Sequence, residues 1–376
     1  MGSVRRAGIA AAAAAAPLGL AYRFALLYRA RAGYPRQHPP TVLPSAFGLP
    51  FETTVARSGD LELPAWFIPA RDGASGPGVA LIHGWESARD RTLPMAVFLH
   101  AAGFHCLMID VRGHGANSPE TLPVSAGEFG ADALAAFRAL VDRPEVTSGA
   151  ISGHSMGGIG AILAGAADPT VRAVVATSSP ADPYRLTRQT FRLARLPIPD
   201  PIAYPLAWLT TRVYLRPRGH RVQDISATRA VAGYRGPILL AHGDADQVVP
   251  VSHVERLAEA AGAARRSPAG APFAPVERLV VPGGEHSWLY EDPTYRATVA
   301  RFLATALRGP LDPEAAAEIA AATAATRLPD GDQHFSAVPE GSGGFRTLAD
   351  VARPSARHDA SRTAGVPATA DEPGLG

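Results

Sequence analysis

Short apolar runs alternate with longer segments of helical composition through the middle of the chain. Glycine or proline lies close to the apolar runs at 78–83, 105–111, 149–154, 171–178, 237–243 and 276–281. Helix-forming residues fill the segments at 91–102, 128–141, 159–167, 251–264 and 293–307. This alternation predicts an α/β fold with a mainly parallel, doubly wound sheet and helices on both faces. An edge hairpin is predicted before it, at 51–55 and 61–69, because Pro64 and Pro69 are tolerated only on edge strands.

The alternation fails over residues 180–235. This segment holds seven prolines, several aromatic residues and many arginines. A structureless loop of this length is uncommon in a compact domain. We therefore predict a mostly helical cap at 180–235, inserted between two late strands of an α/β domain that covers residues 51–308.

Residues 1–33 form an apolar segment whose role the sequence leaves open. Residues 7–22 carry no charge, Arg5 and Arg6 precede them, and Arg23 follows. A membrane span needs ~20 apolar residues, and here that length includes Arg23 and much alanine, which is weakly hydrophobic. A signal peptide fits the basic start, yet no convincing small-residue cleavage site follows. We expect a membrane anchor or a signal, with a helix lying on the membrane or on the protein as the alternative.

Two further segments fall outside the expected catalytic body. Residues 34–50 are rich in proline and predict a linker. Beyond residue 309, one alanine-rich helical patch at 313–326 precedes a segment rich in Gly, Pro, Ser and Asp without apolar periodicity. Such a composition cannot bury enough apolar surface to fold, so we expect residues 309–376 to be a disordered tail.

The composition excludes some functions and leaves the compartment open. Hydrophobic residues make up 47% of the 376 residues, which is ample for a large core, and the single Cys106 excludes an intrachain disulfide. The net charge is only +2, all 36 basic residues are arginine, and no basic run is interleaved with aromatics, so we expect no nucleic-acid partner. The excess of arginine, alanine and proline is typical of biased coding composition, and we expect a bacterial protein. Membrane association through residues 7–28, a cytoplasmic location and secretion stay open as alternatives.

The stretch Ala-Ile-Ser-Gly-His-Ser-Met-Gly-Gly at 150–158 holds the strongest candidate for chemistry. Its apolar run ends in Ser155, which Gly153 and Gly157 flank at two residues on either side. In a G-x-S-x-G elbow the serine occupies a strained turn between strand and helix, and side chains at the two glycine positions would collide with it. The turn exposes the serine hydroxyl and brings the Met156 amide to a helix N-terminus, where an oxyanion can be held. We interpret Ser155 as a nucleophile, the alternative being a Gly-rich turn with an inert serine.

A serine nucleophile needs a histidine to take its proton and an acid to orient that histidine. The expected chain order on such a sheet is Ser, then Asp, then His. Asp244 and Asp246 follow the apolar run at 237–243, and Asp246 lies further out, where it can turn toward a histidine on the neighbouring loop. We favour Asp246 as the acid over Asp244 and Asp182. His286, in the Gly-rich loop after the last strand, is the expected general base.

The second oxyanion donor is expected directly after the run at 78–83. There Gly84 lets the backbone approach the substrate and Trp85 offers its amide, while the Trp85 ring can pack against the cap. Within the cap we expect Phe191 and Trp208 to contact the substrate, together with Trp85. No His or Cys pair has the spacing of metal ligands, so the sequence implies neither a metal nor a cofactor.

Five pieces of the chain, in this order, resemble the α/β-hydrolase superfamily over residues 51–307. They are His-Gly-Trp at 83–85, Asp-Val-Arg-Gly-His-Gly-Ala-Asn-Ser at 110–118, Gly-His-Ser-Met-Gly at 153–157, His-Gly-Asp-Ala-Asp-Gln-Val-Val-Pro at 242–250 and Gly-Glu-His at 284–286. The resemblance implies a nucleophile, an acid and a base at Ser155, Asp246 and His286. It implies oxyanion amides at Trp85 and Met156, and a structural turn beside the active site at 110–118. The chain looks most like small bacterial esterases and the catalytic domains of prolyl-oligopeptidase-like enzymes, and a serine at the elbow argues against the dehalogenase and epoxide-hydrolase branches.

These residues predict a serine hydrolase that cleaves a small carboxylic ester through an acyl-enzyme on Ser155. Peptide hydrolysis or acyl transfer would use the same residues and stays an alternative. A ligand-binding module that has the fold without turnover is the alternative from another class. The apolar residues of the cap predict a preference for medium-chain, uncharged esters over acetate or anionic ones. The natural substrate and the oligomeric state stay open.

Overall fold

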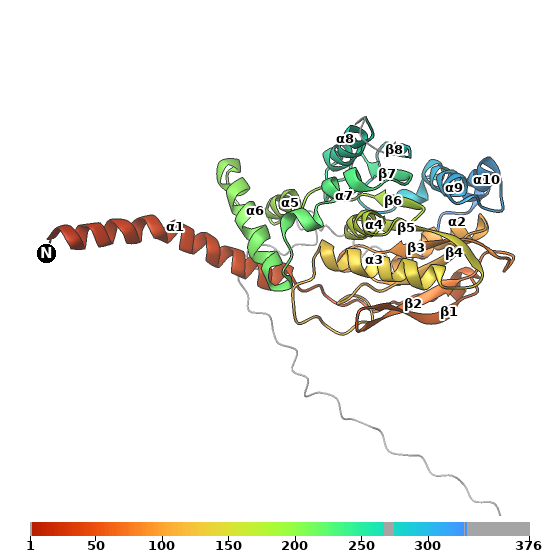
Figure 1. Ribbon diagram of the computed structural model, residues 1–376, viewed down its shortest axis with the longest axis horizontal. Coiled ribbons are helices and arrows are strands. Elements are labelled where there is room, and N and C mark those ends of the chain that lie inside the picture. Colours follow the sequence, from red (N-terminus) through yellow and green to blue (C-terminus); the bar gives the residue numbers. More distant parts are fainter. Residues whose placement is uncertain (1, 267–273, 327, 329–376) are drawn as a thin grey trace, which may run out of the picture.

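One eight-stranded sheet forms the centre of the computed structural model, which describes residues 2–266, 274–326 and 328 (Figure 1). The strand order is β1-β2-β4-β3-β5-β6-β7-β8. The strands are β1 (Glu52–Ser58), β2 (Leu61–Ile68), β3 (Gly76–Ile82), β4 (His105–Ile109), β5 (Val146–His154), β6 (Ala173–Thr177), β7 (Ile238–Gly243) and β8 (Val276–Val281). Pairing is antiparallel at β1 with β2 and at β2 with β4, and parallel from β4 through β8. The predicted mainly parallel sheet with an edge hairpin is therefore confirmed.

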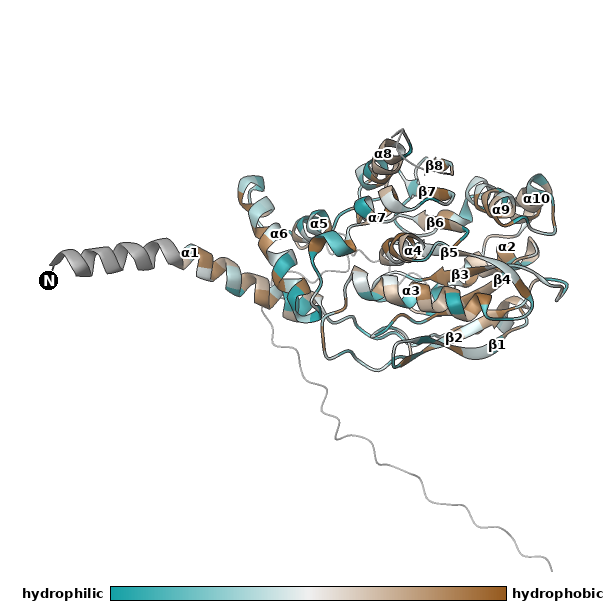
Figure 2. Cartoon of the chain, viewed as in Figure 1, coloured by the Kyte–Doolittle hydropathy of each residue, from teal (hydrophilic) through white to brown (hydrophobic). Residues whose placement is uncertain are grey.

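Helices cover both faces of the sheet and enclose two apolar cores. One face carries α2 (Leu93–Ala101), α9 (Pro293–Leu307) and α10 (Pro313–Ala322); the other carries α3 (Ala126–Val141), α4 (Met156–Ala167), α7 (Ala227–Gly233) and α8 (Ser252–Arg266). In β3, Ala80 and Ile82 belong to the core beneath α3 and α4, whereas Val79 and Leu81 belong to the core beneath α2 and α9. Because both faces of the central strands are buried, their sequences are continuous apolar runs rather than alternating ones, as the colouring of Figure 2 shows.

Local hydrogen bonds decide where some helices begin. The Ser125 hydroxyl accepts the Gly127 N–H at 3.2 Å, and the Glu128 carboxylate accepts the Ser125 N–H at 2.8 Å. This capping box satisfies amides that the first turn of a helix leaves without partners. Helix α3 consequently begins at Ala126, two residues before the start expected from its composition.

The segment between β6 and β7 is helical, as expected. It contains α5 (Pro183–Leu193), α6 (Asp200–Leu215), the short 3₁₀ helices η3 (Arg216–Arg218) and η4 (Val222–Ile225), and α7. Prolines open α5 and α6, where the first turn of a helix tolerates them because its amides lack intrahelical acceptors.

The N-terminal helix α1 (Gly2–Ala32) extends away from the sheet, and its C-terminal half packs against this inserted segment (Figure 1). The Phe24 ring meets the Phe191 ring edge to face, with centroids 5.4 Å apart, and the Tyr28 ring meets Phe191 at 5.7 Å. The Tyr28 hydroxyl lies 2.8 Å from the Thr190 hydroxyl. No helix in the described part of the chain has the length and apolar character that a membrane crossing requires.

The expected linker at 34–50 and the first part of the expected tail both form hydrogen bonds with the α/β domain. In the expected linker 34–50, the backbone amide of Thr41 donates to the Asp90 carboxylate at 2.8 Å. Helix α10 packs on α9 and α2, and the Arg296 side chain donates to the Ala320 carbonyl at 2.9 Å. The expectation of disorder from residue 309 therefore needs correction for α10, because the alanine face of this helix is buried against α9 and α2. Residues 327 and 329–376 of that expected tail lie outside the described residues.

Candidate active site

Ser155 occupies a strained turn between β5 and α4. Its backbone has φ 54° and ψ −117°, a conformation that residues other than glycine rarely adopt. A Cβ on Gly153 would lie 2.0 Å from the Gly157 carbonyl oxygen, and one on Gly157 would lie 2.3 Å from the Ile82 carbonyl oxygen. Only glycine fits at these two positions, so the sequence spacing follows directly from the close backbone approach around the serine.

Ser155, Asp246 and His286 meet at the C-terminal edge of the sheet, at the ends of β5, β7 and β8. The His286 Nε2 atom lies 3.0 Å from the Ser155 hydroxyl oxygen. The His286 Nδ1 atom lies 2.8 Å from the Asp246 carboxylate. Since a carboxylate only accepts, Nδ1 carries the proton and Nε2 is free to accept one from the serine.

The two aspartates of the β7 loop have different contacts. Asp246 is buried, and its second carboxylate oxygen accepts the Val248 and Val249 amides at 2.9 and 2.8 Å. Burial alone would raise the pKa of Asp246, but hydrogen bonds from His242 and His286 outweigh it and hold that pKa well below its usual range. Asp244 instead accepts the Gly283 amide at 2.6 Å and joins the β7 and β8 loops.

His242 is a buried neighbour of this acid that the sequence analysis missed. Its Nε2 atom lies 2.7 Å from the Val249 carbonyl oxygen and 3.2 Å from the Asp246 carboxylate, so its N–H faces both acceptors. From the sequence, a histidine before glycine at the end of a strand has the simpler interpretation of a strand cap. Only the fold of the following loop, which brings Val249 back over β7, reveals the contact.

The expected oxyanion loop follows β3 directly. A Cβ on Gly84 would lie 3.3 Å from the Ser155 Cβ, so the backbone here reaches the serine closely. His83 holds this loop: its Nε2 accepts the Val111 amide at 3.0 Å and its Nδ1 lies 2.7 Å from the Gly84 carbonyl oxygen. Burial lowers the pKa of His83 to about 4, so the ring stays neutral with its proton on Nδ1.

The two amides expected to hold an oxyanion lie on either side of Ser155 in the fold. Met156 is the first residue of α4, and the amide of a first helical residue has no acceptor within its own helix. Trp85 follows Gly84, and its ring stacks on Phe129 of α3 with centroids 6.5 Å apart. The ring also meets His114 of the turn at 110–118 with centroids 5.2 Å apart, so it packs against both α3 and this turn.

The turn at 110–118 is built around a buried ion pair. Arg89 pairs with Asp110, whose carboxylate also accepts the Arg89 amide at 2.7 Å and the Ala116 amide at 2.9 Å. The side chain of Asp110 is fully buried, and it leaves no room for a side chain at Gly115, where a Cβ would lie 2.1 Å from the Asp110 carboxyl carbon. These contacts fix the turn next to the loop that carries Trp85.

Neither Phe191 nor Trp208, the expected substrate contacts of the cap, lines the cavity beside Ser155. Phe191 is only 2% exposed because the aromatic rings of α1 cover it. Trp208 is 52% exposed on α6, with the Arg212 guanidinium 3.4 Å from its ring centre. We therefore assign neither residue a part in substrate binding.

A cavity of about 70 Å³ lies beside the site, on the face of the sheet covered by α2 and α9. Gly84, His154 and Ser287, which adjoin Ser155 or His286, are among the residues that line it. Met95 of α2 and Tyr295 of α9 line its far side. Within the described ranges, no group of three or more His, Cys, Asp or Glu side chains could hold a metal ion.

The sheet order, the serine elbow and the covering helices define the α/β-hydrolase fold. A sequence model of the family described as serine aminopeptidase, S33, matches residues 76–218. The Pyrococcus furiosus esterase Pf2001 superposes with a TM-score of 0.57 at 20% identity, over 74% of this chain and 99% of that one. The Pyrococcus horikoshii acylaminoacyl peptidase superposes with a TM-score of 0.54 at 15% identity, over 74% of this chain and 47% of that one.

Two relatives are similar to this chain in sequence. The uncharacterized protein Rv2307c of Mycobacterium tuberculosis is 29% identical over 264 residues, which are 70% of this chain and 79% of that one. The human protein ABHD12B is 26% identical over 251 residues, 63% of each chain. The family match over residues 76–218 and the superposed structures agree with the architecture described above, and the chain has the α/β-hydrolase fold.

Proposed function

We propose that the protein is a serine hydrolase that cleaves a small carboxylic ester through an acyl-enzyme on Ser155. The observation that carries this proposal is the continuous chain of contacts from the Ser155 hydroxyl to His286, at 3.0 Å, and on to Asp246, at 2.8 Å. Such a chain activates a hydroxyl that is otherwise a poor nucleophile at neutral pH.

The proposed reaction has two steps. The Ser155 oxygen attacks the ester carbonyl while His286 Nε2 takes the hydroxyl proton, and the Trp85 and Met156 amides stabilise the oxyanion. Collapse breaks the bond to the alcohol, which leaves with the proton from His286. A water molecule then attacks the acyl-enzyme, again giving its proton to His286, and the carboxylic acid departs as the Ser155 hydroxyl is restored. Asp246 keeps Nδ1 of the base protonated throughout.

Peptide hydrolysis and acyl transfer remain the alternatives, since they need the same three residues. An aminopeptidase must also bind the ammonium group of its substrate, and a carboxylate is the group suited to that task. None of the described residues that line the cavity beside Ser155 is an aspartate or a glutamate. This lining favours an ester over a peptide with a free amino terminus.

Covalent labelling tests whether the protein turns over substrate or only binds it. A fluorophosphonate probe should label the wild type and leave Ser155→Ala unlabelled, and a panel of esters, amides and lactones should show ester cleavage. An unlabelled wild type, or equal labelling of Ser155→Ala, would contradict the proposal and favour a ligand-binding module.

We also propose that the outer face of α1 contacts an anionic membrane surface. The inner face of its C-terminal half packs on α5 and α6, yet Leu18, Leu20 and Leu27 are 71%, 70% and 52% exposed. A helix that is apolar on both sides is expected to be covered on both. The sequence has no acidic residue before Glu52 and six arginines there, so two copies would repel each other, whereas anionic lipid attracts the segment.

A further inference from the structure

One arginine lines the cavity beside Ser155, and one nitrogen of its guanidinium lacks an acceptor. Arg91 lies two residues before α2 and is partly buried; its Nη1 atom is buried with no hydrogen-bond partner in the described part of the chain. The nearby Arg89 also has one unpartnered nitrogen, Nε, but it differs because its guanidinium is paired with Asp110. A buried donor without an acceptor is costly, and most so when it is charged, so an acceptor from water or from a ligand is expected at Arg91.

The cavity is also within reach of the reacting atoms. Gly84 and His154 line it, and both adjoin Ser155: His154 precedes it in the chain, and a Cβ on Gly84 would lie 3.3 Å from the Ser155 Cβ. A substrate with its carbonyl carbon at the serine oxygen can therefore extend a short group past Gly84 into the cavity.

We propose that this cavity binds a carboxylate carried by the ester substrate, with Arg91 as the group that recognises it. The proposal rests on the proposed ester hydrolysis at Ser155 and names the class of substrate: a small ester with an anionic end. A guanidinium and a carboxylate form charge-assisted hydrogen bonds, which are shorter and stronger than neutral ones.

The size of the cavity limits the length of that substrate. A dry cavity of about 150 Å³ holds a benzene molecule. The volume here is about 70 Å³, so the carboxylate lies only a few atoms from the scissile carbonyl. A small anionic ester differs from the uncharged, medium-chain ester expected from the composition of residues 180–235, whose Phe191 and Trp208 do not line this cavity.

Matched pairs of substrates test the charge directly. The first pair is the 4-nitrophenyl half-ester of glutaric acid and 4-nitrophenyl pentanoate, which have equal acyl lengths with and without a carboxylate. The second pair is carboxymethyl butyrate and propyl butyrate, which carry or lack the carboxylate on the alcohol. The wild type should prefer the charged member in one of the two pairs by about ten- to a hundredfold in kcat/KM, the range expected for hydrogen bonds to charged groups.

The variants Arg91→Gln and Arg91→Lys separate charge from shape. The ratio of charged to uncharged kcat/KM should collapse in Arg91→Gln and be partly restored in Arg91→Lys. Arg278→Gln, on the exposed side of β8, is the matched control and should keep the wild-type ratio. Fluorophosphonate labelling of Ser155 and circular dichroism verify that each variant is folded.

Two results would overturn the subsite: no preference by the wild type in either pair, or an unchanged ratio in Arg91→Gln. Both are distinct from failure of the proposed function. If the wild type hydrolyses the uncharged esters and is labelled at Ser155, the hydrolase stands and only the carboxylate subsite fails. If neither labelling nor hydrolysis occurs, the proposed function itself fails.

Discussion

His154 donates a hydrogen bond from Nε2 to the backbone carbonyl oxygen of His286 at 2.7 Å, and the two imidazole rings lie 4.9 Å apart. Burial lowers the pKa of His154 to about 4, so it holds this loop as a neutral ring. We predict that His154→Ala lowers kcat by on the order of tenfold to a hundredfold with little change in KM, because the loop that carries His286 loses the hydrogen bond that holds it in place. His154→Gln keeps an amide donor and should recover part of kcat; equal losses in both variants would contradict a positioning role.

Substitutions at the two aspartates distinguish the acid from its neighbour. Ser155→Ala should lower kcat by on the order of 10⁶, and Asp246→Asn by less, following the pattern of other serine triads. Asp244→Asn should cost less than Asp246→Asn, since Asp244 only joins two loops through the Gly283 amide. Steady-state kinetics on one activated ester measures all three. A larger loss in Asp244→Asn would mean that the acid is assigned to the wrong residue.

Removing the Phe191 ring should affect stability rather than substrate choice. Phe191 is buried between α5 and α1, and truncation of a buried phenylalanine costs about 3–5 kcal/mol of unfolding free energy. Trp208→Ala is the matched control, because its half-exposed ring loses mainly the contact with Arg212 and should cost less than about 1 kcal/mol. Urea denaturation measures both changes. A shift of the ester chain-length profile in either variant would return these residues to the substrate site.

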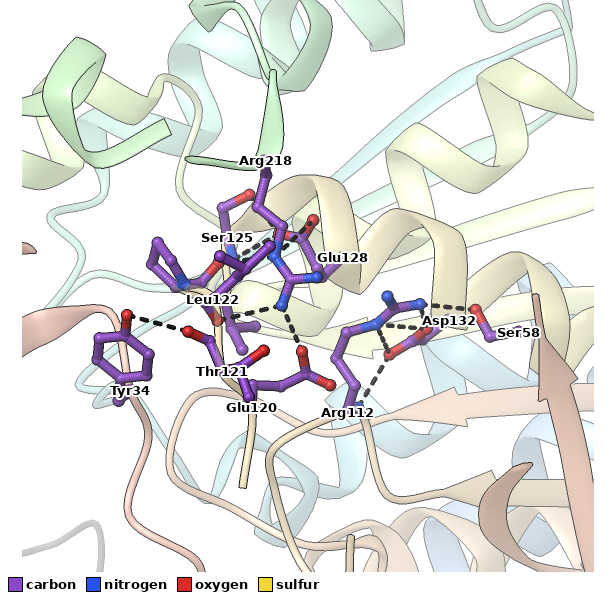
Figure 3. Close-up of polar contacts among 12 residues, drawn as sticks. Tyr34, Ser58, Arg112, Glu120, Thr121, Leu122, Ser125, Glu128, Asp132 and Arg218 are labelled. Atoms are coloured by element: carbon purple, nitrogen blue, oxygen red, sulfur yellow. Dashed lines mark hydrogen bonds and ion pairs between the residues drawn. The ribbon is translucent and has the colours of Figure 1, made fainter. Parts of the chain in front are cut away.

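Glu128 and His220 should stabilise the protein most strongly in mildly acidic solution. The His220 Nε2 atom lies 2.7 Å from the Glu128 carboxylate. Figure 3 shows that Arg218 also approaches Glu128. The hydrogen bond with Glu128 raises the pKa of His220. Burial alone would raise the pKa of Glu128, but its hydrogen bonds with His220 and Ser125 lower it.

These two shifts set a pH window. The contribution of His220 is complete below its unfolded pKa of ~6.5 and is lost as pH rises through the folded value; that of Glu128 is complete above ~4.3 and is lost as pH falls through its folded value. His220→Gln should therefore destabilise the protein more at pH ~5.5 than at pH ~9, by urea denaturation. Arg57→Gln, at the exposed pair with Glu62, should show no such difference. A pH-independent effect of His220→Gln would contradict the linkage.

Vesicle binding tests the outer face of α1. The full chain should co-sediment with vesicles that contain an anionic lipid and less with zwitterionic ones, since arginines near the surface contribute about 1 kcal/mol each. Replacing Leu18, Leu20 and Leu27 together by serine should weaken binding by on the order of a hundredfold or more. Val55→Ser, on β1 at the other end of the molecule, is the control (Figure 1). Binding that ignores the anionic lipid, or a dimer that buries these leucines instead, would contradict the proposal.

The sequence predicts the parts of the molecule that backbone geometry dictates. Gly153 and Gly157 had to be glycine because other backbone segments lie within 2.3 Å of where a Cβ would be, so the elbow is visible as a spacing. The choice of Asp246 over Asp244 rested on which loop position can face a neighbouring loop, and the contacts agree with that geometry.

The remaining features depend on contacts between segments that are distant in the chain. The composition of α5 shows that one side is apolar, but the identity of the helix that covers Phe191 follows from the path of α1. The support of Asp246 by His242, and of the oxyanion loop by His83, likewise arises only when separate loops meet at one edge of the sheet. Arg91 is one of 36 arginines, and it is distinguished by its place in the wall of the cavity beside Ser155 and by its unpartnered Nη1 atom.

Ser155 and His286 are 131 positions apart in the sequence, so the ribosome makes the serine well before the histidine. A ribosome adds about 5–20 residues per second, so the interval between synthesis of the serine and synthesis of its histidine is roughly 7–26 s. The strands β7 and β8, which precede Asp246 and His286 in the chain, are synthesised only in the second half of that interval. Under the proposed mechanism, Ser155 of a nascent chain has no base until residue 286 is made, so ester cleavage starts only after the last strand of the sheet has been synthesised.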